Sequence, residues 1–579
     1  MAFSKVLKVT TLATAVLGLL AACAHAPQPA TPARLTAATG AVLRSCDTLA
    51  AQFQFAQTQL LSAATVAADA VVPNGPAAPA HCLVKGLMNP RKGTDGQDYA
   101  IGFEMRLPQA WNGRFYYQAN GGIDGVVHPA QGALGGGPIT GALAQGFAVI
   151  SSDAGHTSRQ NPRFGADPQA RADYGYQAVG TLTPMAKALI STAYGKGPDR
   201  SYIGGCSNGG RHALVAAARH GDAYDGYLVG APGYRLPNAA LAQLWAAPQW
   251  QDLATPGATT AHPFNPAARI PDLGTALTAA ERQTVARAVL QRCDALDGAA
   301  DGIVAATAAC QAQFKLDRDV PTCNAERNGQ CLSPAQKRLL AAVFTGGKTP
   351  SGQTIYSSFP WDTGIAAANW AQWKFVNSQV LDPAAGYIFM TPPRSLDPFK
   401  VDIEGGLNAT LATDAVFTMS ADSVITPPGK DNPVNLAPLR ARGAKMLLFH
   451  GVSDAIFSAD DTVAYMQRLD RALGGGAANG AADFARYFPV PGMAHCSGGP
   501  ATDQFDALTP LVGWVEQGQA PSTLAARARG PGAAGGANAE LPADWAPGRS
   551  RALCPWPQVT RYKGTGSMDE AAHFSCERP

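Results

Sequence analysis

Short apolar runs recur along the chain and alternate with longer stretches of helical periodicity. Five runs are rich in β-branched and aromatic residues and are flanked by turn-forming residues, which predicts strands. The predicted strands are residues 114–119, 147–153, 200–205, 225–232 and 445–451. Residues 177–195 and 211–221 repeat their apolar positions with the period of a helix. Strands that alternate with helices in this way are typical of a mainly parallel sheet.

The series of strand signals breaks off after Pro232 and returns only near Lys445. The stretch between these two positions is rich in Pro, Gly, Trp and Cys. We therefore predict an α/β core made of residues 41–233 and 441–579, interrupted by an inserted domain at residues 234–440.

The first residues have the pattern of an export signal. Lys5 and Lys8 precede an apolar run that ends at Ala22 and is too short for a permanent membrane helix. We predict a signal peptide at residues 1–23 and a Pro- and Ala-rich tether at residues 24–40. The protein is therefore expected to be exported.

Two ways of processing this signal remain open. Leu20-Ala21-Ala22-Cys23 resembles a bacterial lipobox, in which Cys23 would be lipidated and would anchor the protein to the outer membrane. Ordinary cleavage near Ala24-His25-Ala26 would instead leave a periplasmic or secreted protein. Membrane contact is expected only through the lipid anchor.

Composition narrows the class of partner. The chain has 579 residues, 46% of them hydrophobic, which is enough for a large core and a second domain. Its net charge is +3 and no basic run stands out, so we expect no nucleic-acid partner. We expect a monomer that acts on a small molecule.

Eleven cysteines become informative in an oxidising compartment. Without Cys23 an even ten remain. Eight of these fall into pairs of near neighbours in the sequence, whereas Cys206 and Cys496 have no local partner. The neighbouring pairs are Cys46 with Cys82, Cys293 with Cys310, Cys323 with Cys331, and Cys554 with Cys576. The sequence alone leaves the connectivity open.

Residues 205–209, Gly-Cys-Ser-Asn-Gly, match the G-x-S-x-G pattern of a nucleophile elbow. A predicted strand leads into the motif and an Ala-rich helix follows it. This arrangement presents a serine hydroxyl above a sheet, beside a helix N-terminus that favours negative charge. Ser207 is therefore the candidate nucleophile; the alternative is a structural serine in a Gly-rich connection.

A serine nucleophile needs a base and a carboxylate that orients the base. In chain order the carboxylate precedes the histidine in such folds. Asp454 follows the predicted strand at residues 445–451, and His495 follows a further strand predicted at the start of "YFPVPGMAHCSGG". Asp460 and Asp461 compete with Asp454, but the sequence around them indicates a helix start. His450 lies within a strand and is expected to be buried.

The motif Cys206-Ser207, with Asp454 and His495-Cys496, resembles the tannase and feruloyl esterase family. The segments "WNGRF", "GAPGYRLP", "CDALDGAADGIV" and "VPGMAHCSGGP" carry the same resemblance. It implies a disulfide-rich α/β-hydrolase core with a large inserted lid domain. It also implies that Ser207 is the nucleophile, His495 the general base and Asp454 the orienting acid. Finally, it implies a Cys206–Cys496 disulfide beside the four neighbouring pairs.

Two backbone amides are expected to form the oxyanion hole. The amide that follows the nucleophile belongs to Asn208. The second should come from an earlier turn, and the resemblance selects Gly122, with Gly121 as its neighbour.

Residues 293–310 form an acidic, Gly-containing loop bounded by two cysteines. Asp294, Asp297 and Asp301 supply hard oxygen ligands that suit Ca²⁺ better than zinc, although such turns are often only solvated. The family resemblance implies a structural Ca²⁺ here, with the carbonyls of Ala299 and Ile303 as further ligands.

Aromatic residues indicate a flat acyl group. The lid offers Trp361, Trp370 and Trp373, each of which could equally fill the lid's own core, and Phe457 follows the acid. The resemblance places Trp373 and Phe457 against the substrate ring. It implies a serine carboxylesterase for esters of terephthaloyl, feruloyl or galloyl type.

The chain also departs from its family. Members that hydrolyse terephthalate monoesters hold the free carboxylate with a lid arginine, but none occurs here between Trp373 and Arg394, where Lys374 is the single cation. Asn208 also replaces an acid found in those members. Which ester is the natural substrate therefore stays open. A catalytically silent binding lipoprotein of the same fold is the alternative, and a serine peptidase is a weaker one.

Overall fold

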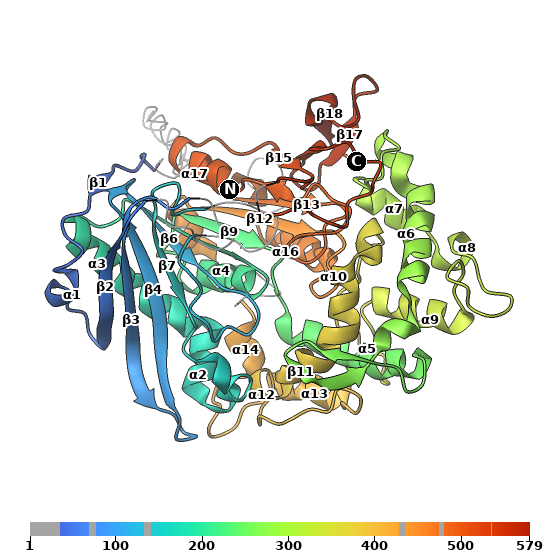
Figure 1. The fold of residues 1–579 in the computed structure, drawn as a ribbon, viewed down its shortest axis with the longest axis horizontal. Coiled ribbons are helices and arrows are strands. Elements are labelled where there is room, and N and C mark those ends of the chain that lie inside the picture. Colours follow the sequence, from blue (N-terminus) through green and yellow to red (C-terminus); the bar gives the residue numbers. More distant parts are fainter. Residues whose placement is uncertain (1–34, 69–76, 133–140, 428–435, 474–479, 534) are drawn as a thin grey trace, which may run out of the picture.

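The structure is a computed structural model that describes residues 35–68, 77–132, 141–427, 436–473, 480–533 and 535–579. The predicted signal peptide, Cys23 and most of the predicted tether lie outside the described residues. Figure 1 shows a large twisted sheet on one side of the molecule and a group of helices, α5 to α9, on the other.

The sheet has nine strands in the order β13-β12-β9-β8-β6-β7-β4-β3-β2. The strands from β13 to β7 run parallel, and β4, β3 and β2 continue the sheet in antiparallel pairs. Their bounds are β2 Thr58–Val66, β3 His81–Lys92, β4 Asp98–Pro108, β6 Arg114–Gln118, β7 Ala148–Ser152, β8 Arg200–Cys206, β9 Gly226–Gly230, β12 Lys445–Gly451 and β13 Ala485–Val490.

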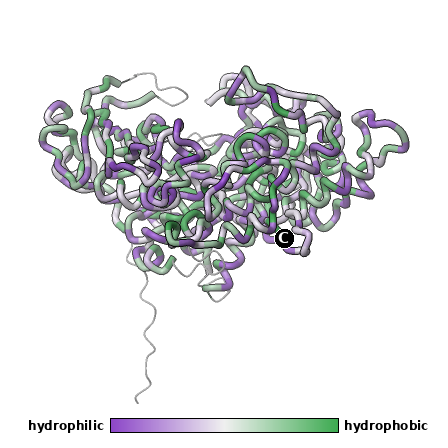
Figure 2. The backbone as a smooth tube through the Cα atoms, turned by 90° about the horizontal axis from the view of Figure 1, so that it is seen from below, coloured by the Kyte–Doolittle hydropathy of each residue, from purple (hydrophilic) through white to green (hydrophobic). Residues whose placement is uncertain are grey.

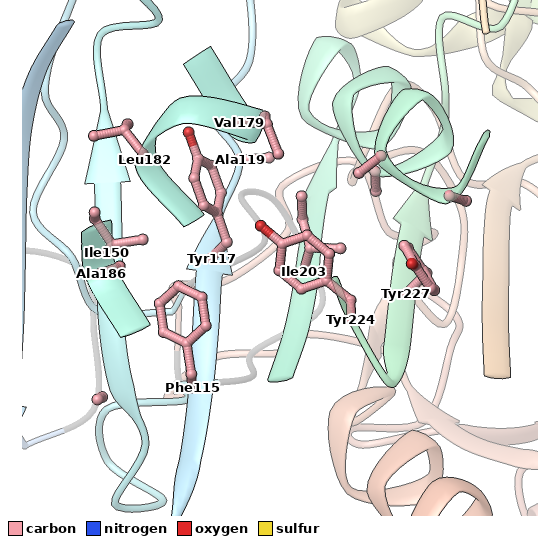
Figure 3. Close-up of a cluster of buried hydrophobic side chains, with 14 of the residues drawn as sticks. Phe115, Tyr117, Ala119, Ile150, Val179, Leu182, Ala186, Ile203, Tyr224 and Tyr227 are labelled. Carbon is pink, nitrogen blue, oxygen red and sulfur yellow. The ribbon is translucent and has the colours of Figure 1, made fainter. Parts of the chain in front are cut away.

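Both faces of the sheet are buried because successive side chains of each strand point to opposite sides. Phe115 and Tyr117 of β6 pack with helices α3 (Ala178–Tyr194), α4 (Asn208–Arg219) and α16 (Ala459–Ala472). Tyr116 points the other way, into a cluster that includes Leu511 of α17 (Leu508–Gln517). Figure 3 shows the first cluster, with Tyr117 near Leu182 of α3 and Phe115 further along β6. Such two-sided burial explains the nearly continuous apolar runs.

The five predicted strands coincide with β6, β7, β8, β9 and β12, and the two predicted helices with α3 and α4. The prediction misses the antiparallel strands β2 to β4. The side chains of the edge strand β2 are largely exposed and those of β3 are only partly buried, whereas charged residues such as Glu104 and Arg106 interrupt the apolar run of the mostly buried β4. The prediction is also wrong in finding no strand between Pro232 and Lys445. A short hairpin, β10 (Thr259–His262) and β11 (Asn265–Pro271), lies there with mostly exposed side chains. The α/β-hydrolase fold class itself is confirmed.

The chain between β9 and β12 is mainly helical and has its own apolar cluster, which contains Trp250, Val289, Leu340 and Trp370. Its helices are α5 Leu236–Leu253, α6 Ala279–Cys293, α7 Thr307–Gln313, α8 Leu316–Asp319, α9 Pro334–Phe344, α10 Ala368–Ala371, α11 Ser378–Val380, α12 Ala385–Ile388, α13 Ile403–Leu411, α14 Ala421–Ile425 and α15 Ala437–Ala441. A π-helical turn, η7 (Gln372–Asn377), joins α10 to α11. This turn carries Trp373.

Smaller elements complete the fold. The remaining ones are β1 Ala41–Val42, α1 Leu49–Gln52, β5 Ala110–Trp111, α2 Pro168–Ala172, β14 Gln504–Phe505, β15 Leu524–Arg527, β16 Ser550–Leu553, β17 Val559–Tyr562 and β18 Phe574–Glu577. Figure 2 shows hydrophobic and hydrophilic stretches alternating along the backbone in both halves of the molecule. In the part of the chain that the structure describes, no helix is both long and apolar enough to span a bilayer.

Candidate active site

Ser207 lies at the sharp turn between β8 and α4. Its backbone has φ 65° and ψ −128°, a strained conformation for a residue with a side chain. Gly205 and Gly209 make the turn possible, because a Cβ on either would lie 2.3 Å from the carbonyl oxygen of Ala119. The G-x-S-x-G spacing thus reflects close packing of the turn against the neighbouring strand end, as a nucleophile elbow requires.

Ser207, His495 and Asp454 form a continuous hydrogen-bonded series. The distance between His495 Nε2 and Ser207 Oγ is 2.8 Å, and that between His495 Nδ1 and Asp454 Oδ2 is 2.7 Å. Asp454 follows β12 and His495 follows β13, the two parallel strands that end on the same side of the sheet as β8. The structure therefore brings together three residues that are far apart in the sequence.

Asp454 is buried and accepts several hydrogen bonds. The N–H groups of Ile456 and Phe457 donate to its Oδ1, and His450 Nε2 lies 3.2 Å from its Oδ2. Burial alone would raise the pKa of Asp454, but the charge of His495 and the hydrogen bonds from His450 and His495 outweigh it, so the pKa lies below its ordinary value. Asp454 is thus a carboxylate that orients the His495 ring.

Two competing aspartates lie elsewhere. Asp461 pairs with Arg235 at 2.7 Å, and Asp460 accepts a hydrogen bond from Ser358. Ser458 caps the N-terminus of α16, as the sequence predicts for this segment. The contact of His450 with Asp454 was not predicted. His450 lies in the strand and Asp454 lies four residues later in the loop that follows it. This short separation is the sequence signal that could have indicated their contact.

A disulfide joins Cys206 to Cys496, so that one covalent bond links the residue before Ser207 to the residue after His495. The Cα atoms of this pair are 6.1 Å apart. The structure also contains the other four disulfides that the resemblance implies. These are Cys46–Cys82, Cys293–Cys310, Cys323–Cys331 and Cys554–Cys576.

The backbone amides of Gly122 and Asn208 lie beside Ser207 in the lining of one pocket. Among the described residues neither N–H has an acceptor. Gly122 has a φ of 66°, a conformation that favours glycine. A Cβ on Gly121 would lie 3.9 Å from Ser207 Cβ, which places this turn directly against the nucleophile. Gly122 and Asn208 therefore remain the candidates for the oxyanion hole.

A buried polar network lies behind these two amides. Asp124 Oδ2 accepts hydrogen bonds from Asn208 Nδ2 at 2.8 Å and His212 Nε2 at 2.9 Å. Asn208 Oδ1 accepts from Arg211 Nε at 2.7 Å and from Tyr174 at 3.2 Å. The sequence analysis did not identify Asp124 or His212. Their signal in the sequence was weak. Asp124 lies in a turn without a motif of its own, and His212 is one of ten histidines in the chain.

The pocket over Ser207 is mostly apolar. Trp373 and Phe457 both line it, and their ring centres lie 4.8 and 5.4 Å from that of His495. The other two candidate tryptophans do not line it. Trp361 stacks on Phe344 and Trp370 packs in the cluster inside the lid. One predicted lid tryptophan thus faces the site.

The acidic loop at residues 293–310 lies apart from this pocket. Asp294 and Asp297 accept hydrogen bonds from backbone amides of the loop, and Asp301 forms an ion pair with Arg551. Burial raises the pKa of Asp297 to about 7, and the nearby charges of Asp301 and Asp294 contribute to this increase. The donor set suits a hard cation. Among the described residues, however, no group of three or more His, Cys, Asp or Glu side chains is arranged to hold a metal ion.

Comparison with known proteins agrees with this geometry. A family profile described as tannase and feruloyl esterase matches residues 82–577. A mono(2-hydroxyethyl) terephthalate hydrolase of Piscinibacter sakaiensis is 38% identical over 543 residues, which cover 87% of this chain and 86% of that protein. A probable feruloyl esterase B-1 of Aspergillus fumigatus is 26% identical over 82% of each chain.

Among solved structures, the crystal structure of feruloyl esterase B from Aspergillus oryzae superimposes with a TM-score of 0.72. The match covers 92% of this chain and 100% of that chain, at 22% sequence identity, and shows a shared fold. The profile and the relatives confirm the resemblance that the sequence motifs indicate. The chain therefore belongs to the tannase and feruloyl esterase family and is a carboxylic ester hydrolase.

Proposed function

We propose that this chain is an exported serine carboxylesterase that acts as a monomer on esters of aromatic carboxylic acids. The observation that carries the proposal is the hydrogen-bonded series from Ser207 through His495 to Asp454, which opens into an apolar pocket lined by Trp373 and Phe457. Such a series activates a serine hydroxyl, and the apolar walls suit a flat ring.

The reaction proceeds through an acyl-enzyme. His495 Nε2 takes the proton of Ser207 Oγ as this oxygen attacks the ester carbonyl, and Asp454 stabilises the resulting imidazolium. The negative oxygen of the tetrahedral intermediate accepts hydrogen bonds from the N–H groups of Gly122 and Asn208. His495 then gives its proton to the departing alcohol as the C–O bond breaks. Water attacks the acyl-enzyme by the same steps, and Ser207 Oγ is the leaving group.

The names of the relatives suggest which acyl groups to test. One relative acts on a terephthalate monoester and another is a probable feruloyl esterase. Gallate esters complete the panel because the family includes tannases. Lys374 does not substitute for a carboxylate-binding arginine in the pocket, because its ammonium lies 4.2 Å from the ring centre of Phe359, and it is absent from the pocket lining.

Two further features belong to the proposal. Export is supported by five disulfides in the described chain and by the signal pattern at residues 1–23. We propose that Cys23 carries a lipid anchor; mass spectrometry of the mature N-terminus distinguishes this from cleavage near Ala26. We also propose a structural Ca²⁺ in the loop of Asp294, Asp297 and Asp301, which would require Asp301 to exchange its ion pair with Arg551 for the ion.

The proposal is tested by ester turnover. Wild-type protein is assayed with mono(2-hydroxyethyl) terephthalate, methyl ferulate, methyl gallate and a nitrophenyl ester. We expect hydrolysis of aromatic esters and a loss of at least about a thousandfold in kcat for Ser207→Ala. Ser191→Ala, an exposed serine on α3, serves as the control. Wild-type protein that hydrolyses none of the esters, or a Ser207→Ala variant with near-normal kcat, would contradict the proposal.

A further inference from the structure

The lid contributes one carboxyl group to the described lining of the apolar pocket, that of Asp382. This residue begins the turn η8 (Asp382–Ala384), which follows the segment that carries Trp373. Leu381, Ala385 and Phe389 surround it in the lining. Asp382 is 7% exposed, and its Oδ2 is buried without a hydrogen-bond partner among the described residues. A buried polar atom without a partner is costly unless a ligand supplies one.

The other polar side chains in the lining already have partners. Ser207 is bonded to His495, and Tyr174 donates to Asn208. The side chain of Asn208 is held by Asp124 and Arg211. Asp382 is therefore the buried carboxyl that remains available to a bound molecule. The core supplies Ser207 to the pocket, and the lid supplies Asp382.

We propose that Asp382 determines acyl specificity by hydrogen bonding to a hydroxyl group on the aromatic ring of the ester, in preference to a second carboxylate. The inference rests on the esterase function proposed for the same pocket. Ser207 and Asp382 line the same pocket, so an acyl group bound with its ester carbonyl at Ser207 would present its ring to the lid residues, and a ring hydroxyl would supply the partner that Asp382 lacks.

The charge of the pocket supports this preference. The described lining contains no Arg, Lys or His. Burial raises the pKa of Asp382 well above its ordinary value, with the charge of Lys374 acting in the opposite direction. A neutral carboxyl both donates and accepts hydrogen bonds, which matches a hydroxyl. A second carboxylate on the ring would instead be buried beside an acid without a cation in the lining.

The test compares three matched esters: methyl benzoate, methyl 4-hydroxybenzoate and monomethyl terephthalate. For each ester, kcat/KM of Asp382→Leu is divided by that of the wild type, which cancels the intrinsic reactivity of the ester. We expect this ratio to be at least about tenfold lower for the hydroxylated ester than for methyl benzoate, and highest for monomethyl terephthalate. Asp382→Asn keeps a donor and an acceptor and should retain most of the hydroxyl preference.

Asp397→Leu is the matched control, because it removes an exposed carboxylate from the same lid. It should leave all three ratios equal. If Asp382→Leu does not fold, 4-hydroxybenzamide and benzamide are compared as competitive inhibitors of the wild type. We expect the hydroxylated amide to bind about tenfold more tightly.

Equal ratios for the three esters, or equal inhibition by the two amides, would overturn the role of Asp382. Wild-type protein that hydrolyses none of the three esters would instead count against the proposed esterase function. The two failures are therefore distinguishable.

Discussion

At the scale of single residues, Asp124 has a position that the triad alone does not explain. It lies two residues after Gly122 and bonds to the side chain of Asn208, so that one carboxylate connects the two segments that supply the oxyanion amides. His212 holds the same carboxylate from one turn further along α4. We expect Asp124 to act as a positioning residue that keeps both amides directed at the developing oxyanion.

Asp124→Asn tests this role with little change in shape. Asp124 has a φ of 54°, which Asn tolerates as well as Asp does. At pH 8 we expect kcat to fall by about tenfold or more with little change in KM, because a neutral amide oxygen accepts the hydrogen bonds from Asn208 and His212 more weakly than a charged carboxylate does. The measurement is steady-state kinetics on a nitrophenyl ester.

The same variant carries a pH prediction. Burial raises the pKa of Asp124 to about 7, against the lowering influence of the charges on His156, Arg211 and His128 and of the Asn208 hydrogen bond. Asp124 is thus ionised above pH 7 and protonated below it. The ratio of wild-type to Asp124→Asn kcat should therefore be large at pH 8 and shrink below pH 7, while the pH dependence that both proteins share cancels in the ratio. A ratio that does not change with pH would show that Asp124 is only structural.

At the scale of elements, the loops after β8, β12 and β13 supply the triad, and the lid holds two of them in place. Asp362 of the lid accepts hydrogen bonds from Ser453 Oγ at 2.9 Å and from the Gly492 amide at 2.7 Å. Asn369 of the lid also accepts a bond from the His495 amide at 3.3 Å. The lid therefore covers the pocket and also fixes the loops of Asp454 and His495.

The Cys206–Cys496 disulfide ties the elbow to the histidine loop. Its removal should slow catalysis, because it fixes the distance between the nucleophile and its base. We expect the double variant Cys206→Ala/Cys496→Ala to lose about tenfold or more in kcat, which corresponds to about 1.4 kcal/mol in the barrier. The measurement is kcat at a temperature well below the unfolding transition.

Cys554→Ala/Cys576→Ala provides the comparison. This disulfide joins the end of β16 to β18, away from the residues that line the pocket. Its loss should lower the free energy of unfolding, by about 2–5 kcal/mol for a typical disulfide, with little effect on kcat. Equal kcat in the two double variants would mean that the Cys206–Cys496 bond only stabilises the fold.

At the scale of the whole molecule, the proposed Ca²⁺ loop links the lid to the C-terminal strands. Arg549, which directly precedes β16, donates to the carbonyl of Asp301, and Arg551 of β16 pairs with its carboxylate. If Ca²⁺ binds there, it stabilises the native state by about 2.7 kcal/mol at a concentration one hundred times its Kd. Chelation should then lower Tm by several degrees and leave kcat at 25 °C nearly unchanged.

The control is Asp294→Asn/Asp297→Asn, whose Tm should not respond to the chelator. Elemental analysis of protein purified without chelator provides the second readout. Protein without bound calcium, or equal Tm shifts in the wild type and the double variant, would exclude a calcium site in this loop.

Much of the core could be predicted from the sequence because short segments of the chain carry the patterns that define its strands and its nucleophile turn. Strands buried on both faces appear as apolar runs, and the turn around Ser207 needs glycines at fixed spacing because Ala119 lies against it. Chain order and strand ends then indicated Asp454 and His495. The strands β2 and β3 and the β10–β11 hairpin escaped prediction because partly exposed strands have a weaker apolar pattern, and β4 escaped it because charged residues interrupt its apolar run.

Contacts between distant segments were decided only by the tertiary structure. The sequence places Asp124 near Gly122 and His212 on the helix after Ser207, but it does not indicate that His212 bonds to the carboxylate of Asp124. Nothing near Asp382 in the sequence indicates that it lines the pocket of Ser207. The same holds for the choice of Trp373 over Trp361 and Trp370, because all three have similar neighbours in the sequence. The sequence determined which elements form and which residues could react. The packing of lid on sheet decided which side chains face the reacting serine, because that depends on how distant surfaces fit together.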